Sequence, residues 1–168
     1  MSKKIKKRPK LIVFDLDYTL WPFWMHSQVN PPFSKSVSGA VLDSKGITIK
    51  HYEEVPKVLE TLKQKGYVLA IASRTPKVNS AQQLIELFDW NKYFTYKEIY
   101  PGRKTMHFSK VRTQSGIQFD DMLFFDDELR NIYDLRSAGV VSVLVRDGVN
   151  QEIVNRGLKD YAHERSFK

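Results

Sequence analysis

A short apolar strand that ends in two carboxylates constrains the fold of this chain more than any other stretch. Residues 11–14 read Leu-Ile-Val-Phe, a pattern typical of a strand buried on both faces of a parallel sheet. Asp15 and Asp17 follow at once, separated by one residue. Two carboxylates near the buried end of a strand are costly to desolvate unless a cation compensates them. Ligands bind outside the carboxyl ends of such strands, and Mg²⁺ prefers carboxylate oxygens, so we expect a magnesium site here.

The rest of the chain alternates apolar strand patterns with helical ones. This alternation predicts parallel βαβ units with right-handed crossovers. We therefore expect an α/β fold, a Rossmann-like three-layer α/β/α sandwich around a central parallel sheet, with residues 10–168 forming a single domain. The strand at 94–100 is mixed in polarity, so we place it near the sheet edge. The expected strands cover residues 11–14, 67–72, 94–100, 122–125 and 140–145, and the last helix covers residues 150–163.

Residues 21–51 interrupt this alternation. Prolines at positions 22, 31 and 32 oppose a continuous helix in this segment. Residues 40–43 and 47–51 flank the turn sequence Ser-Lys-Gly, which predicts a short β-hairpin. We interpret residues 21–51 as a flap insert beside the carboxyl end of the sheet, too short for a second domain.

The net charge of +8 is concentrated at the N-terminus. Residues 1–10 hold six Lys or Arg and no acid, so the remaining chain is close to neutral. We interpret residues 1–9 as a basic, flexible tail, with a nuclear-localisation or polyanion-binding patch as the alternative. The absence of cysteine excludes disulfides and thiolate chemistry. No apolar run approaches the ~20 residues of a membrane span, so we expect no membrane association and a cytoplasmic location, with the nucleus as the alternative.

Polar side chains follow each of four predicted strands. Asp15 and Asp17 follow the first strand, Ser73 the second, and Lys104 the third, and two adjacent acids follow the fourth. The carboxyl ends of parallel strands meet at one edge, so these side chains should lie together. Phosphoryl transfer needs such a set: a nucleophile, cations for the transferring oxygens, and a proton donor for the leaving oxygen. For the cation, the alternatives to Lys104 are Lys92, Lys97, Arg103 and Lys110.

The strings FDLDYTLWPFW, ASRT and FFDDE followed by Asn131 resemble the haloacid dehalogenase superfamily, and within it the small magnesium-dependent phosphatases. The resemblance implies that Asp15 is the nucleophile and that Asp17 is the general acid and base. It also implies the groups that hold phosphate: Ser73, Arg74, Lys104 and the backbone at Leu16.

The same resemblance implies the magnesium ligands. Asp15 binds the ion through its carboxylate and Asp17 through its backbone carbonyl. In this superfamily the direct ligand of the last motif stands four residues before an Asp or Asn. Asn131 therefore assigns that ligand to Asp127, which leaves Asp126 to support the site without direct contact to the metal.

The spacing of the motifs implies a phosphatase without a cap domain. Only 53 residues separate Thr19 from Ser73, and these must also supply a core helix and strand. An open site implies hydrolysis of phosphate monoesters through an aspartyl-phosphate. The substrate would be a phosphotyrosine protein, which would make the chain a protein-tyrosine phosphatase, or a phosphosugar. We expect a monomer and no nucleic-acid partner.

Two other functions stay open, and three are excluded. A nucleic-acid end phosphatase would use the same fold, and a non-catalytic phosphate-binding module is the alternative outside enzymes. A nucleotide kinase lacks its G-x-x-x-x-G-K motif here, and a dinucleotide oxidoreductase lacks G-x-G-x-x-G. A receiver domain would place its lysine after, not before, the second acidic site.

Overall fold

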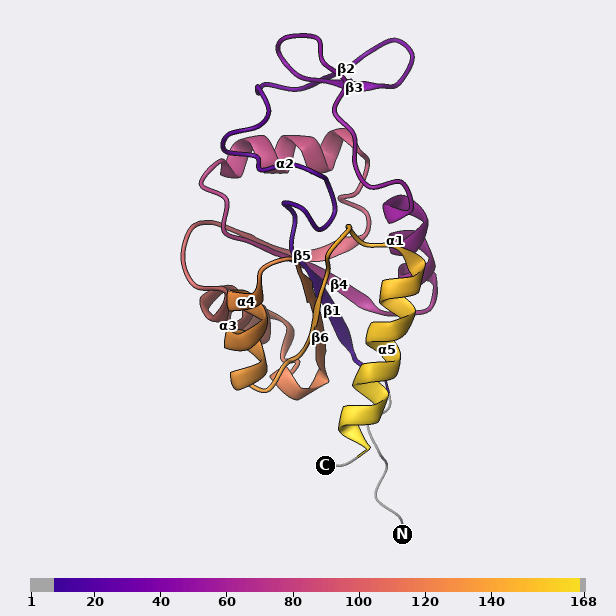
Figure 1. Ribbon diagram of the computed structural model, residues 1–168, viewed down its shortest axis with the longest axis vertical. Coiled ribbons are helices and arrows are strands. Elements are labelled where there is room, and N and C mark those ends of the chain that lie inside the picture. The colour runs from indigo at the N-terminus through magenta and orange to yellow at the C-terminus, as the bar shows by residue number, and fades with distance from the viewer. Residues whose placement is uncertain (1–7, 167–168) are drawn as a thin grey trace.

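A five-stranded parallel sheet forms the centre of the molecule, as predicted. The computed structural model describes residues 8–166. The strand order is β5-β4-β1-β6-β7, with β1 at the centre and β5 at one edge (Figure 1). The bounds of these strands are β1 Leu11–Phe14, β4 Val68–Ser73, β5 Phe94–Ile99, β6 Met122–Asp126 and β7 Val141–Leu144.

Helices cover both faces of this sheet, because alternate side chains of each buried strand point to opposite sides. Ile12 and Phe14 of β1 face a core built with α1, α2 and α5, whereas Leu11 and Val13 face a second core built with α3 and α4. Figure 1 shows α5 and α1 on one side of the sheet and α3 and α4 on the other. This is the predicted three-layer sandwich. Among residues 8–166 no helix is long and apolar enough to cross a bilayer. The helix bounds are α1 Val55–Gln64, α2 Val78–Leu87, α3 Lys104–Ser115, η1 Phe119–Asp121, α4 Leu129–Ser137 and α5 Gln151–Arg165.

Two strands extend one residue beyond their apolar runs. Ser73 still pairs with Ile99 of β5, and Asp126 still pairs with Leu144 of β7. Val145 also donates its N–H to the Asp126 carbonyl at 2.8 Å. Two of the predicted site residues are therefore fixed by the sheet itself, and their side chains stand at its carboxyl edge.

The flap contains a small antiparallel pair of strands, of which the sequence predicted only the second. β2 (Ser34–Lys35) pairs with β3 (Val41–Leu42), at the end of the molecule beyond α2 (Figure 1). Across the predicted turn at residues 44–46, an isolated β-bridge joins Leu42 to Thr48. β2 was missed because its two side chains are polar and exposed, and so give no apolar alternation.

Of the predicted basic tail, residues 1–7 lie outside the described residues. Arg8 lies over the ring of Tyr67 at 4.0 Å and donates to the Lys65 carbonyl. Pro9 is buried. The last two residues of that segment therefore contact the folded domain.

Candidate active site

A buried lysine joins the first and the last acidic motifs. Lys104, at the start of α3, places its Nζ 2.8 Å from Asp15 Oδ1 and 2.8 Å from Asp126 Oδ2. Its side chain is 1% exposed. Burial alone would lower the lysine pKa, but the two carboxylates outweigh burial and raise it. Lys104 therefore keeps its positive charge. The alternatives named from the sequence do not make these contacts with Asp15 and Asp126: Lys92, Lys97, Arg103 and Lys110.

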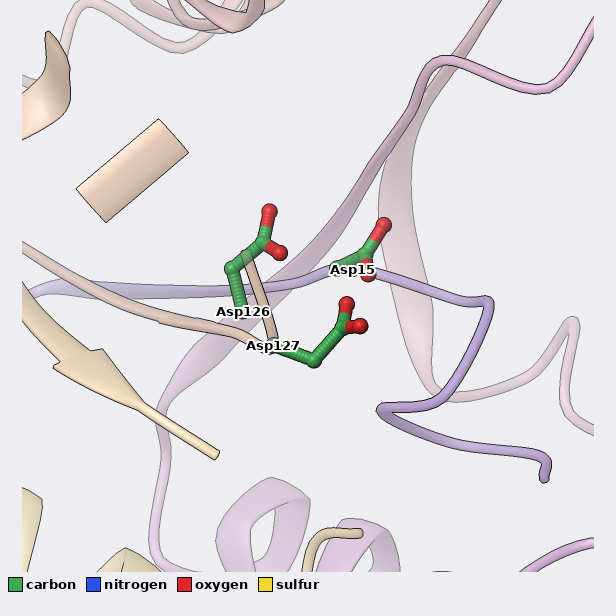
Figure 2. Close-up of side chains that lie close together, drawn as sticks. All are labelled: Asp15, Asp126 and Asp127. Atoms are coloured by element: carbon green, nitrogen blue, oxygen red, sulfur yellow. The ribbon is translucent and has the colours of Figure 1, made fainter. Parts of the chain in front are cut away.

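Three carboxylates converge beside this cation because β1 and β6 are adjacent and in register. Phe14 lies opposite Phe125, so the residues that follow, Asp15 and Asp126, stand side by side. Ligand oxygens of Asp15, Asp126 and Asp127 all lie within 4.8 Å of one another. Figure 2 shows the Asp127 carboxylate directed toward Asp15. This concentration of negative charge is what a hard divalent cation stabilises.

The two adjacent aspartates have different surroundings. Asp126 is fully buried and accepts from Lys104 Nζ, from Asn131 Nδ2 at 3.0 Å and from the Glu128 N–H at 2.9 Å. No N–H group among residues 8–166 donates to the Asp127 carboxylate. Burial, followed by repulsion from Asp15 and Asp126, raises the pKa of Asp127 to about 9. Asp127 is the carboxylate that still needs a positive partner.

The residues present fit a magnesium ion. Besides the three carboxylates, the Asn131 Oδ1 atom is buried and has no hydrogen-bond donor among residues 8–166. An unpaired buried oxygen is costly unless a donor, a water or an ion satisfies it. Asn131 also lines the cavity above the carboxylates. The donor set is thus composed only of oxygens, which is the set that Mg²⁺ binds.

Asp17 is held apart from this charged cluster by the first turn of the flap. The Trp21 Nε1–H donates to Asp17 Oδ1 at 2.8 Å, and the Met25 N–H donates to Oδ2 at 3.3 Å. Tyr18, with a φ of 56°, turns the chain so that Trp21 returns beneath Asp17. Burial raises the pKa of Asp17, and the hydrogen bonds from Trp21 and Met25 oppose that rise only in part. A raised pKa brings a carboxyl group closer to the proton affinity that a general acid needs.

Ser73 and Lys104 are joined by a residue that the sequence did not single out. His107 lies on α3 and is fully buried. Its Nε2 lies 2.9 Å from the Ser73 carbonyl oxygen and 2.7 Å from that of Tyr100, and its Nδ1 lies 3.0 Å from that of Arg103. The ring also stacks on Tyr100 at 4.2 Å. His107 therefore links the end of β4 to the loop that precedes Lys104.

A signal for His107 was present in the sequence. The buried residues of α3 are Lys104, His107, Phe108 and Val111, which follow the i, i+3, i+4, i+7 spacing of an inward helix face. A lysine and a histidine on such a face must find polar partners inside the fold. A pattern of apolar residues alone does not include them.

A cavity of about 500 Å³ opens above these groups. Most of the predicted site residues line it, whereas Leu16 does not. The Leu16 side chain is buried in the core, and its carbonyl accepts from the N–H groups of Thr19 and Leu20. Asp126 is fully buried and does not line the cavity either. The lining residues are Asp15, Asp17, Trp24, His26, Ser73, Arg74, Thr75, Pro76, Lys104, Asp127, Glu128, Arg130 and Asn131.

Comparisons with known proteins identify the family of the chain. The model of a family described as Acid Phosphatase matches residues 7–164. The chain is 49% identical over 154 residues to the Homo sapiens protein named Magnesium-dependent phosphatase 1, covering 92% of this chain and 88% of the human one. It is 40% identical over 134 residues to a HAD-like hydrolase superfamily protein of Schizosaccharomyces pombe, covering 73% and 78%.

Solved structures share the fold. The N-terminal part of a Bacteroides fragilis protein, containing a phosphatase domain complexed with Mg, has a TM-score of 0.59 at 17% identity, covering 96% of this chain and 40% of that one. The 3-deoxy-D-manno-octulosonate 8-phosphate phosphatase of Moraxella catarrhalis, in complex with magnesium, phosphate and its sugar, has a TM-score of 0.54 at 19% identity, covering 97% and 95%. At these identities the likeness establishes the architecture alone.

Proposed function

The chain belongs to the acid phosphatase family and is a magnesium-dependent phosphatase of the haloacid dehalogenase superfamily, and from that premise we propose that it hydrolyses phosphate monoesters through an aspartyl-phosphate on Asp15. The family and the metal predicted from the motifs are confirmed. The observation that carries the mechanism is the contrast between two carboxyl groups two residues apart. Asp15 is paired with Lys104, whereas Asp17 has a raised pKa and neutral donors around it.

The first step forms a bond between an Asp15 carboxylate oxygen and phosphorus and breaks the bond from phosphorus to the ester oxygen. Asp17 gives its proton to that departing oxygen, so the leaving group departs as an alcohol or phenol. Thr19 Oγ1 donates to Asp15 Oδ2 at 3.0 Å, and Lys104 donates to Oδ1. These two donors fix the plane of the attacking carboxylate.

The second step returns the enzyme to its starting state. Asp17, now ionised, takes a proton from a water molecule, whose oxygen attacks phosphorus and displaces the Asp15 carboxylate. Lys104, the Ser73 hydroxyl and Arg74 lie around the same cavity and would bind the oxygens of the phosphoryl group. His107 holds Ser73 and the start of α3 at a fixed spacing, so these donors move together.

Mg²⁺, when bound, would offset the repulsion between the incoming phosphate and the carboxylates and stabilise the charge on the transferring oxygens. The Asp15 and Asp127 carboxylates and the Asp17 carbonyl would hold it. Asp126 would support the site without direct contact, because its oxygens already accept from Lys104, Asn131 and the Glu128 N–H. Asn131, which lines the same cavity and has no donor for its buried Oδ1 among residues 8–166, would accept there from a water bound to the ion.

The substrate we propose is a phosphotyrosine on a protein or a phosphosugar. Between β1 and α1 the described chain contains only the two-residue strands β2 and β3, so no folded cap closes the cavity. An uncovered cavity admits a phosphate group on a bulky carrier. A single chain brings Asp15, Asp17, Ser73, Lys104 and Asp127 to the cavity, so we propose that a monomer is active.

A substrate panel tests this function. Phosphotyrosine peptides, phosphosugars and a 3′-phosphorylated oligonucleotide would be assayed with Mg²⁺, alongside Asp15→Asn and an EDTA control. We expect hydrolysis of the first two classes, and none with the variant or with EDTA. Preference for the oligonucleotide, with a steep loss of rate in salt, would instead support the nucleic-acid end phosphatase. Phosphate binding without turnover of any ester would support the binding module.

A further inference from the structure

One tryptophan in this chain is placed outside the core. Trp21 and Trp90 are 0% and 1% exposed, whereas Trp24 is 46% exposed and lines the catalytic cavity. A partly exposed indole in the wall of a polar cavity presents a large apolar surface to whatever the cavity binds.

The indole of Trp24 is held in place by neighbouring residues of the flap and of the turn before it. Tyr18 meets it edge to face at 5.3 Å, and His26 stacks on it at 6.2 Å. Gln28 Oε1 accepts from the Trp24 N–H at 2.7 Å and from the Tyr18 hydroxyl at 2.8 Å. These contacts orient the ring and leave it 46% exposed, so the exposed part of its surface is preorganised for a ligand.

The position of Trp24 relates it to the leaving group. The next residue, Met25, donates its N–H to Asp17, and the same turn supplies the Trp21 indole to Asp17. Asp17 is the proposed proton donor to the ester oxygen. A group attached to that oxygen must therefore lie beside the segment that carries Trp24.

We propose that Trp24, backed by Tyr18 and His26, forms a leaving-group subsite that binds the flat face of a ring. This inference rests on the proposed hydrolysis of phosphate monoesters and specifies which esters the site selects. The shared chemistry is a planar, weakly polar ring face, found on an aryl ester such as phosphotyrosine and on one face of a phosphosugar. Esters with short acyclic leaving groups make no such contact.

The kinetic test compares leaving groups within one enzyme. The ratio of kcat/KM for phosphotyrosine to that for ethyl phosphate should fall about 3–10-fold in Trp24→Ala, the range typical of one aromatic contact, and recover largely in Trp24→Phe. The loss should appear mainly in KM. Tyr133→Ala is the matched control, because Tyr133 is 61% exposed on α4 and does not line the cavity, so its ratio should equal that of the wild type. The same ratio measured with glucose 6-phosphate distinguishes a sugar ring from an aryl ring.

Tryptophan fluorescence tests the contact directly. Phenylphosphonate, which has no ester bond to break, should quench the emission of the Mg²⁺-loaded protein, and the quenching should be absent in Trp24→Phe. Methylphosphonate should bind without that signal. Equal kcat/KM ratios for Trp24→Ala and wild type, or quenching that survives in Trp24→Phe, would overturn the subsite. Absence of hydrolysis for every ester would instead overturn the proposed function, whatever the fluorescence shows.

Discussion

Replacing Lys104 with methionine is the sharpest perturbation of the buried charge network. Methionine keeps the length and the apolar stem of the side chain but removes the cation. In the metal-free protein, Asp15 and Asp126 then face each other with no positive partner, at exposures of 10% and 0%. Their own hydrogen bonds from Thr19, Asn131 and the Glu128 N–H remain.

The size of the effect follows from the geometry. Two unit charges 2.8 Å apart attract by about 6 kcal/mol at an effective dielectric constant of ~20, and Lys104 makes two such contacts. The desolvation of the lysine offsets much of this attraction. Removing one partner of a buried ion pair therefore costs about 3–5 kcal/mol of unfolding free energy. This is a large part of the roughly 5–15 kcal/mol that a domain of this size possesses.

Urea unfolding in EDTA measures the loss, and a double-mutant cycle assigns it. The cost of Lys104→Met with Asp126→Asn should be smaller than the sum of the single costs by about 2–3 kcal/mol. The loss should shrink as the pH falls, because protonation of the carboxylates removes their repulsion. Lys92→Met is the control: Lys92 lies 2.9 Å from Asp89, but both side chains are exposed, so the urea midpoint should not change. Equal midpoints for Lys104→Met and Lys92→Met would refute the reasoning.

Other predictions concern the metal site and the ring of His107. The folded-state pKa of Asp127, about 9, lies above the ordinary value of 3.8, so the contribution of this group to the stability of metal-free protein is greatest below pH 4 and is lost as the pH rises toward 9. Calorimetry in EDTA should record that fall in stability. Mg²⁺, which binds the deprotonated form of Asp127, should reverse it. A metal-free protein that gains stability from pH 5 to 8 would show that Asp127 does not cause the pH dependence. His107→Phe, which keeps a ring beside Tyr100 but loses the contacts to the carbonyls, should lower kcat on the order of 10²-fold with little change in Mg²⁺ affinity, and His107→Gln should recover part of the loss. A normal kcat for His107→Phe would show that the ring does not position Ser73 and Lys104.

The sequence predicted the sheet and the meeting of its polar ends because both depend on regular patterns. Five strands and their connecting helices determine a parallel order, and that order brings Asp15, Ser73, Lys104 and Asp127 to one edge. No detailed packing is needed for this inference. The chemical roles of these residues remain proposals that the experiments above test.

What could not be predicted depends on contacts between distant segments. The three carbonyls around His107 come from residues 73, 100 and 103, and only the folded chain shows that one ring reaches them all. The flap gives a second example. Its sequence does not reveal that the Trp21 indole donates a hydrogen bond to Asp17 whereas the Trp24 indole lines the cavity. Two tryptophans three residues apart have opposite surroundings, and the backbone turn at Tyr18 decides which is buried.

The central claim is that Asp15 is the nucleophile and Asp17 the proton donor, and mass spectrometry of trapped enzyme tests it most directly. Asp17→Asn would be mixed with Mg²⁺ and an aryl phosphate, quenched in acid and digested. The aryl ester has a good leaving group, so Asp15 should still be phosphorylated, while water attack without Asp17 should be slowed by about 10²–10⁴-fold. We predict a phosphorylated peptide carrying the modification on Asp15, and none from Asp15→Asn. Phosphate on any other residue, or normal turnover by Asp15→Asn, would contradict the account.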